Sequence, residues 1–217
     1  MTTSSLRRAL APTQRKKAEV TVACDGSCLK NPGGATGWAW VASDGRWAAA
    51  GMETGTNQVA ELWGVLSVLR DFPHDPLVIQ IDSEYAMKAA TVWGKSWARS
   101  GWRTREGTLI KNITLVKGIF TLMAHRTEPV RFVKVPGHDP QGRWPLNTAA
   151  DRLAGRAARL ARTQGEKVSM KGLDKAITQA RVAEPSRAKA PTAESAREMC
   201  NSCGRRIAID GRCGCFD

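Results

Sequence analysis

Residues 21–33 read TVACDGSCLKNPG, in which a mostly apolar run meets a carboxylate and a glycine-rich turn. Two more alternating segments, residues 37–43 and 46–54, follow after Gly-rich or Asp-Gly turns. Alternation with a period of two indicates half-buried strands, and short turns of this kind join such strands as hairpins. The stretch therefore predicts the first of three hairpin-connected strands, with Asp25 at its end.

The rest of the chain alternates between helical and strand patterns. Apolar residues recur at helical spacing in residues 60–70, and residues 76–82 are apolar nearly throughout, as in a central strand. Further helices are predicted at 83–91, 109–125 and 146–161, and a further strand at 130–135. Strands and helices in this order predict an α/β fold with a mixed sheet flanked by helices.

Four carboxylates lie in surroundings that suit a metal site, and three of them stand where predicted elements begin or end: Asp25, Glu61, Asp82 and Asp151. Side chains placed in this way can converge over one end of a sheet. Like charges in a poorly solvated site raise one another's pKa unless cations lie between them. Carboxylate oxygens suit Mg²⁺ or Mn²⁺, and a pair of such ions about 3.5–4 Å apart is a known arrangement for in-line phosphodiester cleavage.

Charge and hydropathy narrow the class of partner and the location. The chain has 33 Lys and Arg against 20 Asp and Glu, a net charge of +13, which predicts a polyanionic partner, although solubility alone is the simpler alternative. No apolar stretch approaches the ~18–20 residues that span a membrane. Residues 1–17 are basic and lack acids, which fits a disordered arm better than a transit peptide. We expect a cytoplasmic, monomeric protein.

Six ordered motifs resemble those of type 1 ribonuclease H, the bacterial and eukaryotic enzyme that cuts RNA paired to DNA. They are DGSCLKNPG, TNQVAEL, IDSEY, a tryptophan-rich basic segment ending in KN, VPGH and NTAAD, within residues 18–163. So many motifs in one order are far more specific than a single short pattern. The resemblance implies a five-stranded mixed sheet of order 3-2-1-4-5 and hydrolysis of the RNA strand of RNA–DNA hybrids, leaving 5′-phosphate and 3′-hydroxyl ends.

The same resemblance implies a role for each acidic residue and for one histidine. Asp25 would bridge two Mg²⁺ or Mn²⁺ ions, while Asp82 and Asp151 would complete the site of the ion that activates water. Glu61 would serve the second ion and reach the 2′-hydroxyl of the RNA. His138, in the PGHDPQG loop, would help proton transfer or product departure. Two rivals remain: a non-catalytic hybrid-binding module and a nuclease that cuts DNA on the same architecture.

Amide side chains near these acids are candidates for reading the 2′-hydroxyl, which distinguishes RNA from DNA. They are Asn31, Asn57 and Gln58. For Asn31 a turn, and for Asn57 a helix cap, is an equally good explanation. Glu84 departs from the amide that relatives often carry after the Asp-Ser pair, which adds a negative charge near the site.

Residues 93–111 combine tryptophans with basic side chains and contain one acid. Helix-spaced aromatics are most often core, but here the intervening residues are basic, and basic aromatic segments suit stacking on bases and contact with phosphates. We expect Trp93 to be partly structural. The expected substrate contacts are Trp97, Trp102, Arg99, Arg103 and Arg105, which match the family's basic protrusion and would follow the DNA strand.

The C-terminal part is predicted to be a linker followed by a small metal module. Residues 164–196 are rich in Ala, Lys, Arg and Pro without a sustained apolar face, which is typical of a flexible linker. Within residues 197–217 four thiols form two close pairs, Cys200, Cys203, Cys213 and Cys215. This pattern favours a Zn²⁺ knuckle over free or disulfide-linked thiols or an iron–sulfur cluster. The module would bind nucleic acid or a replication or repair protein.

Overall fold

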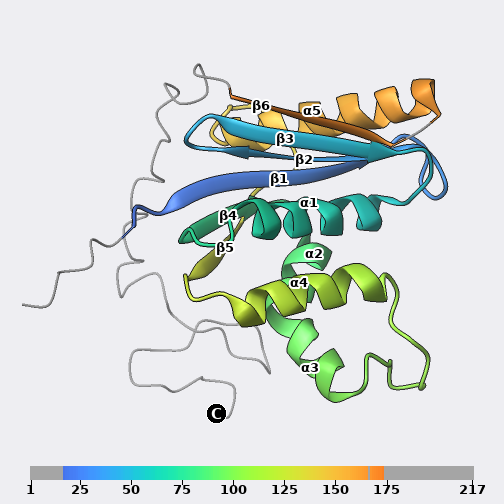
Figure 1. Cartoon of the computed structure of the whole chain (residues 1–217). Coiled ribbons are helices and arrows are strands. Elements are labelled where there is room, and N and C mark those ends of the chain that lie inside the picture. Colours follow the sequence, from blue (N-terminus) through green and yellow to red (C-terminus); the bar gives the residue numbers. More distant parts are fainter. Residues whose placement is uncertain (1–16, 166, 174–217) are drawn as a thin grey trace, which may run out of the picture. The chain divides into compact units, whose positions relative to one another are not determined.

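The computed structural model describes residues 17–165 and 167–173, which form one mixed sheet with helices on both faces (Figure 1). The strand order is β5-β4-β1-β2-β3-β6. The strands are β1 (Val20–Cys28), β2 (Thr36–Ala42), β3 (Arg46–Met52), β4 (Leu77–Ile81), β5 (Val130–Lys134) and β6 (Val168–Leu173). Within these described ranges no helix combines the length and the apolar character needed to cross a bilayer.

The predicted hairpins and the predicted strand order are confirmed. β1 pairs with β2 and β2 with β3, both antiparallel, while β4 runs parallel to β1 and β5 parallel to β4. Parallel neighbours must be joined by a crossover, and α1 (Asn57–Asp71) lies between β3 and β4 in the chain. The expected order 3-2-1-4-5 is therefore present within the sheet.

The predicted number of strands was wrong, because a sixth strand pairs antiparallel with β3. This strand, β6, lies within residues 164–196, which were expected to be a linker. Its sequence, VSMKGL, contains a lysine and a glycine and is too short to show a clear alternation. It pairs because the outer edge of β3 offers a row of unpaired backbone groups, which is a property of the folded sheet.

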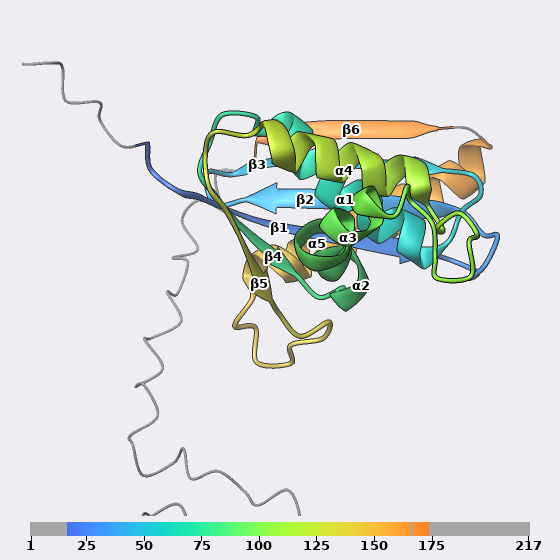
Figure 2. The same cartoon turned by 90° about the horizontal axis from the view of Figure 1, so that it is seen from below.

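Two helical layers cover the two faces of the sheet (Figure 2). Alternate residues of β1 face opposite sides: Val22 and Cys24 belong to the core formed with α1 and α4 (Ile113–His125), and Ala23 to the core beneath α5 (Pro145–Gln164). The division arises because successive side chains of a strand point to opposite faces of the sheet. It decides which face each functional side chain of β1 can reach.

α5 lies unusually close to the sheet because glycines and alanines meet at the contact. A Cβ on Gly37 would lie 2.5 Å from the backbone nitrogen of Ala158, and one on Gly51 would lie 2.7 Å from the carbonyl oxygen of Ala157. Both distances are too short for any side chain. The close approach fixes the height of α5 above β2 and β3, and with it the height of Asp151, which lies two turns before Ala158.

The tryptophan-rich segment forms α2 (Glu84–Lys88), a π-helical turn η1 (Ala89–Trp93) and α3 (Gly94–Arg99), followed by a loop closed by pairing of Arg103 with Leu109. The next helix was predicted to begin at residue 109 and begins at Ile113 instead. Asn112 has a φ of 56°, in the left-handed region, which a continuous right-handed helix cannot contain. The loop therefore extends four residues further than the apolar pattern suggested.

Candidate active site

Asp25 lies inside β1 rather than at its end, which corrects the prediction. Its Cα is paired with that of Ala39 on β2, and β1 continues to Cys28. On the other side, however, the pairing with β4 stops at Ala23. Asp25 is therefore two residues beyond the last pair with β4, only 8% exposed, and its Oδ1 accepts a hydrogen bond of 2.6 Å from the backbone N–H of Gly26.

Gly26 brings the first turns of α1 against β1. A Cβ on Gly26 would lie 2.5 Å from the carbonyl carbon of Ala60 and would also collide with the backbone nitrogen of Glu61. Only glycine permits this approach. The Asp25-Gly26 pair is thus the place where the strand carrying Asp25 meets the helix carrying Glu61.

Two polar side chains hold the carboxylate of Glu61. Nδ2 of Asn57 donates a hydrogen bond of 2.8 Å to Oε1 of Glu61, and the hydroxyl of Ser83 donates to Oε2. The cap of α1 is Thr56, whose hydroxyl accepts from the N–H of Val59 at 3.2 Å, so the alternative reading of Asn57 as the cap is wrong. Asn57 instead positions an acid, and nothing in its sequence context distinguished that role.

Asp82 follows the last residue of β4, as expected for an acid at the end of a strand. It is not a helix cap, because Ser83 caps α2 by accepting from the N–H of Ala86. Nζ of Lys134, at the end of β5, donates to the backbone carbonyl of Asp82. A Cβ on Gly137 would lie 2.8 Å from Oδ2 of Asp82, so the VPGH loop also passes directly over this carboxylate.

Asp151 and His138 line one hollow of about 300 Å³ together with Asn147 and Trp144. Asp151 is exposed on the second turn of α5, and His138 is exposed in the loop between β5 and α5. The Oδ1 atom of Asn147 is buried without a hydrogen-bond partner. The structure therefore places His138 and Asp151 in the lining of the same hollow.

The loop that carries His138 is organised by Asp139, which the sequence did not single out. One of its carboxylate oxygens accepts from the backbone N–H groups of Arg143 and Trp144 at 2.5 and 3.2 Å, and the other accepts from the N–H of Gln141 at 3.3 Å. Its side chain is 2% exposed. An aspartate four residues before an arginine in a loop is a weak signal, and only the closed loop reveals the role.

The acids influence one another electrostatically. Burial, and then the neighbouring charge of Asp82, raise the pKa of Asp25 to about 7, although the Gly26 N–H opposes the shift; Asp151 and Glu61 add to it. Burial is also the largest cause of the raised pKa of Glu61 and of Asp82. Lys134 counteracts both shifts, since its positive charge favours the ionised carboxylates. The four predicted acids thus lie within one electrostatic neighbourhood.

The donor chemistry of this neighbourhood fits a hard divalent cation. All four candidate ligands are carboxylates, the oxygen donors that Mg²⁺ and Mn²⁺ prefer. In the part of the chain that the structure describes, no three His, Cys, Asp or Glu side chains are already arranged as a metal site. The acids therefore lie near one another without forming a closed ligand cage, and the pKa values of Asp25, Glu61 and Asp82 are raised.

Three of the predicted substrate residues, Asn31, Gln58 and Trp97, line two hollows that share Gln58 and Lys111. Asn31, Gln58, Lys111 and Asn112 line one of about 420 Å³, and Gln58, Trp97 and Lys111 also line one of about 230 Å³. Oδ1 of Asn31 accepts from the backbone N–H of Asn57 at 3.2 Å, so this residue has a local structural role as well. Lys111 and Asn112 had been noted only as the end of the basic segment.

The tryptophans of the basic segment are partly buried, whereas its arginines are exposed. Trp93 and Trp97 have ring centroids 5.5 Å apart, and Trp102 meets Phe120 edge to face at 5.6 Å. All three tryptophans pack against the core beside α1 and α4. The exposed basic side chains are Arg99, Arg103 and Arg105.

Of the two cysteines that flank Asp25, Cys24 is buried and Cys28 is half-buried. Cys24 is fully buried, and burial first, then the nearby carboxylates, raise the pKa of its thiol. It is therefore an inert core residue rather than a nucleophile. The predicted Zn²⁺ ligands, Cys200, Cys203, Cys213 and Cys215, lie outside the described residues.

Comparison with known proteins gives a family match. The RNase H family model matches residues 17–159. A protein named ribonuclease HI from Streptomyces coelicolor is 41% identical over 148 residues, which cover 65% of this chain and 62% of that protein. A ribonuclease H from Tropheryma whipplei (strain Twist) is 37% identical over 143 residues, covering 64% of this chain and 84% of that one.

Solved structures share the fold. The crystal structure of LC9-RNase H1, described as a type 1 RNase H with the type 2 active-site motif, matches with a TM-score of 0.56 at 23% identity, covering 71% of this chain and 78% of that one. The foamy viral protease-reverse transcriptase in complex with an RNA/DNA hybrid matches with a TM-score of 0.51 at 18% identity, covering 74% of this chain and 22% of that one.

Proposed function

Because the chain belongs to the RNase H family, we propose that it is a ribonuclease H that hydrolyses the RNA strand of RNA–DNA hybrids. The observation that carries the proposal is the coupling of the acids around Asp25, whose pKa is raised to about 7 by burial and by three neighbouring carboxylates. Such a cluster is unfavourable unless cations are recruited to it. The products would be 5′-phosphate and 3′-hydroxyl ends.

Two Mg²⁺ or Mn²⁺ ions would be held by Asp25, Glu61, Asp82 and Asp151. When bound, they would acidify the attacking water and neutralise the leaving 3′-oxygen. The chain's own residues set up this chemistry. Asn57 and Ser83 orient the carboxylate of Glu61, so that it can reach both an ion and the 2′-hydroxyl of the RNA. His138, beside Asp151, can hold or transfer a proton as the product leaves.

Hybrid binding would use the two hollows next to the acids and the exposed arginines beyond them. Asn31, Gln58 and Lys111 offer hydrogen-bond donors to the backbone and sugars of the RNA. The arginines of the basic segment would contact phosphates of the DNA strand. Trp97 and Trp102 present only part of their rings, so they would contact sugars at their edges rather than stack between bases.

The proposal is tested by cleavage assays on a matched RNA–DNA hybrid, duplex RNA and duplex DNA, each with Mg²⁺ and with a chelator. We expect cleavage of the RNA strand of the hybrid alone, and only with Mg²⁺. Binding of the hybrid without cleavage would identify a non-catalytic module. Cleavage of duplex DNA would identify a DNA-strand nuclease. Either result would overturn the proposal.

For the rest of the chain we keep the predictions as proposals: a basic arm at residues 1–17, a linker within 164–196 and a metal module at 197–217. The module would hold one Zn²⁺ on its four cysteine thiolates and bind nucleic acid or a replication or repair protein. Elemental analysis of the purified chain should find about one zinc per molecule, and serine at Cys200 and Cys203 should remove it. Zinc retained in that variant would contradict the assignment. A cytoplasmic location and a monomeric state also remain proposals.

A further inference from the structure

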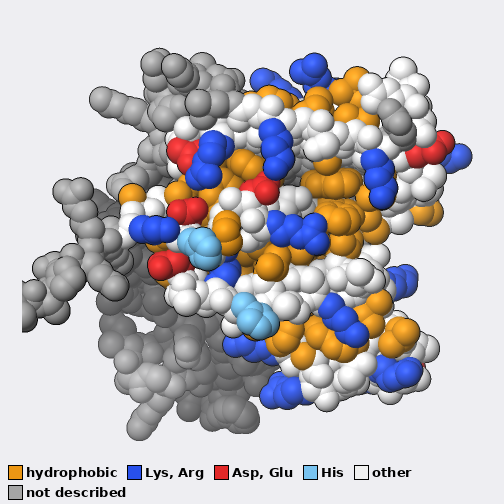
Figure 3. Space-filling model, viewed as in Figure 1, with side chains coloured by type: hydrophobic (Ala, Val, Ile, Leu, Met, Phe, Trp, Pro, Cys, Tyr) orange, Lys and Arg blue, Asp and Glu red, His pale blue; other side chains and the backbone are white. Residues whose placement is uncertain are grey.

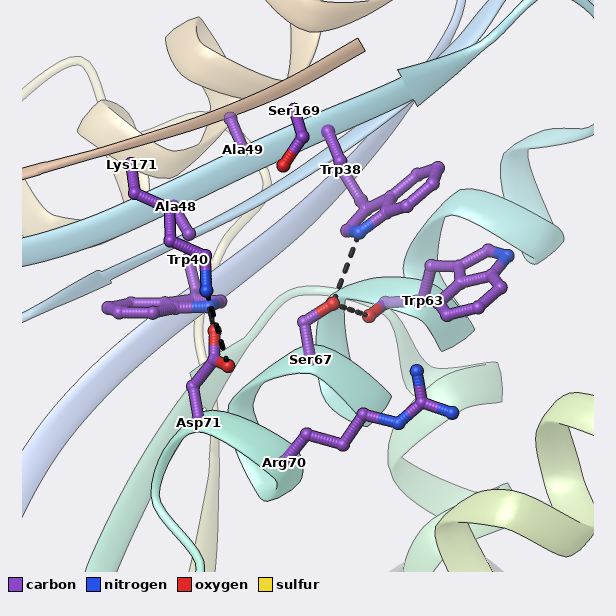
Figure 4. Close-up of a pocket in the computed structure, with 11 residues that line it drawn as sticks. Trp38, Trp40, Ala48, Ala49, Trp63, Ser67, Arg70, Asp71, Ser169 and Lys171 are labelled. Atoms are coloured by element: carbon purple, nitrogen blue, oxygen red, sulfur yellow. Dashed lines mark hydrogen bonds and ion pairs between the residues drawn. The ribbon is translucent and has the colours of Figure 1, made fainter. Parts of the chain in front are cut away.

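A groove lined by three tryptophans lies on the α1 face of the sheet (Figure 4). We call it the aromatic groove. Its volume is about 220 Å³. It is lined by Trp38, Trp40, Ala48, Ala49, Ala50, Trp63, Ser67, Arg70, Asp71, Ser169 and Lys171.

The groove is open because large and small residues face each other across the strands. Trp38 on β2 is paired with Ala50 on β3, and Ala50 with Ser169 on β6; in the next row Trp40 is paired with Ala48, and Ala48 with Lys171. Residues two apart on a strand share a face, so the two rows lie side by side. The alanines form a low floor between a wall of indole rings and a wall of polar side chains from β6.

The ring nitrogens are already satisfied by α1, and the accessible ring surface belongs to Trp38 and Trp63, because Trp40 is only 5% exposed. Nε1 of Trp38 donates to the hydroxyl of Ser67 at 3.1 Å, and Nε1 of Trp40 donates to Oδ2 of Asp71 at 2.9 Å. Trp63 stacks on Trp38, with ring centroids 5.0 Å apart and planes 15° apart. These contacts fix the rings before any ligand arrives, so little side-chain entropy remains to be lost on binding.

The rim of the groove carries more positive than negative charge. The guanidinium of Arg70 lies 5.5 Å from the ring centroid of Trp63, and Nζ of Lys171 lies 3.9 Å from Oδ1 of Asp71. Asp71 is the only acid in the lining and is already engaged by Trp40 and Lys171. In Figure 3, hydrophobic surface is exposed at the level where Figure 1 shows the sheet above α1, with Lys and Arg side chains beside it.

We propose that the aromatic groove binds one base of a single-stranded nucleic acid, with Arg70 and Lys171 contacting the flanking phosphates. Preordered indole rings offer a stacking surface to any base, and the excess of cations matches an anionic backbone. The groove is separate from the candidate active site. Trp38 and Trp40 face α1, whereas Asp25, paired with Ala39 between them, faces the opposite side of the sheet. The proposal does not depend on the hydrolytic function.

Direct contact is tested by photocrosslinking. The full-length protein is mixed with a single-stranded deoxyoligonucleotide that contains 5-iodouracil, irradiated, digested and analysed by mass spectrometry. Because this base crosslinks efficiently to aromatic rings that it stacks on, we expect adducts on Trp38 or Trp63, the two partly exposed rings of the groove. Adducts confined to other tryptophans, such as Trp97 or Trp102, would overturn the proposal.

Affinity is tested by fluorescence anisotropy with the same strand in two variants and a control. Ala50→Leu fills the floor of the groove, and Arg70→Gln removes a rim charge without touching the core. Loss of one stacked base predicts a Kd raised roughly 5- to 100-fold in Ala50→Leu, and a smaller rise in Arg70→Gln. The control, Arg162→Gln, removes the same charge from the exposed last turn of α5.

The outcomes separate the possible occupants. Thermal melts followed by circular dichroism show whether the Ala50→Leu variant is folded. If that variant is unfolded, the Kd of Arg70→Gln is compared with that of the Arg162→Gln control instead. A Kd in both variants within twofold of the control would exclude the groove as a strand site. The proposal would also be overturned if the protein bound thymidine monophosphate but not the strand. It would likewise be overturned if a protein partner bound tightly and left the affinity for the strand unchanged.

Discussion

At the scale of single residues, the site depends on side chains that hold the acids in place. Asn57 and Ser83 donate to Glu61, and Lys134 donates to the backbone carbonyl of Asp82. Gly26 and Gly137 allow α1 and the VPGH loop to reach the acids. The acids alone would repel one another, so the donors, the cation and the glycines make their convergence possible before a metal is bound.

Asp25→Asn should abolish turnover while leaving hybrid binding largely intact. The amide keeps the shape of the side chain but removes the charge that would bridge two ions. Loss of that charge stabilisation is expected to lower kcat by roughly 10³-fold or more. Single-turnover cleavage and filter binding of the same hybrid measure the two effects. Persistent cleavage in Asp25→Asn would show that the site has been assigned wrongly.

The raised pKa of Asp25 predicts a stability that falls as pH rises in the metal-free protein. The folded carboxyl titrates at about 7, above the value of about 3.9 in an unfolded chain. Between these values the carboxyl of Asp25 holds more protons in the folded than in the unfolded state. The contribution of Asp25 to the free energy of unfolding is therefore fully present at low pH and is lost as the pH rises to about 7.

Asp25→Asn removes this pH dependence. Urea unfolding in EDTA should therefore show the variant to be more stable than wild type by a few kcal/mol at pH 8, with a much smaller difference at pH 5. Taking the difference between the two proteins cancels the titration of all other groups that Asp25 does not perturb. An equal difference at both pH values would contradict the burial of an ionisable Asp25.

At the scale of secondary-structure elements, loops and strand edges carry features that local patterns do not show. The loop between β5 and α5 is closed by one buried aspartate, and the outer edge of β3 is covered by β6. In both cases the partner groups are backbone amides brought together by the fold. The loop carries His138, which lines the same hollow as Asp151.

Asp139→Ala should lower kcat about as much as His138→Ala does, and the double variant should be no worse than either. Removing the carboxylate releases the backbone N–H groups that close the loop, so His138 loses its position. A histidine that transfers a proton contributes roughly 10²- to 10⁴-fold to kcat, with little change in KM. Steady-state kinetics on the hybrid measure all three variants. Additive losses would mean that Asp139 acts independently of the histidine.

At the scale of the whole molecule, the surface has an acidic candidate active site and separate basic regions. Four acids influence one another at the candidate active site, while the chain as a whole carries +13. Exposed arginines at the end of α3 and in the following loop, and the rim of the aromatic groove, add positive charge outside that site. A polyanion would therefore be attracted over a wide area and cleaved at one place only.

Replacing Arg99, Arg103 and Arg105 together by Gln should weaken hybrid binding and reduce its dependence on salt, with kcat unchanged at saturating hybrid. Each lost phosphate contact lowers the slope of log K against log salt by about 0.7–0.9. Deleting residues 197–217 should have the same two effects if the tail binds nucleic acid. Titrations at several NaCl concentrations measure the slope. An unchanged slope in either protein would remove that region from the interface.

The sequence by itself determined the family, the α/β class, the order of the first five strands and the identity of the candidate acids. Asp25, Glu61, Asp82 and Asp151 were recognisable because each lies in a short motif with a fixed neighbour pattern, and such patterns are local. The hairpins and α1 were recognisable for the same reason, since turn residues and apolar spacing act over a few positions.

Only the tertiary structure decided which strands pair and which side chains from different elements meet. β6 was missed because its pairing depends on the free edge of β3, and VSMKGL has no strong pattern of its own. Ser83, Lys134 and Asp139 were missed because a serine, a lysine and a loop aspartate gain their roles from partners on other elements. The aromatic groove exists because two alanines of β3 face two tryptophans of β2, a match set by strand register, and register is a property of the folded sheet.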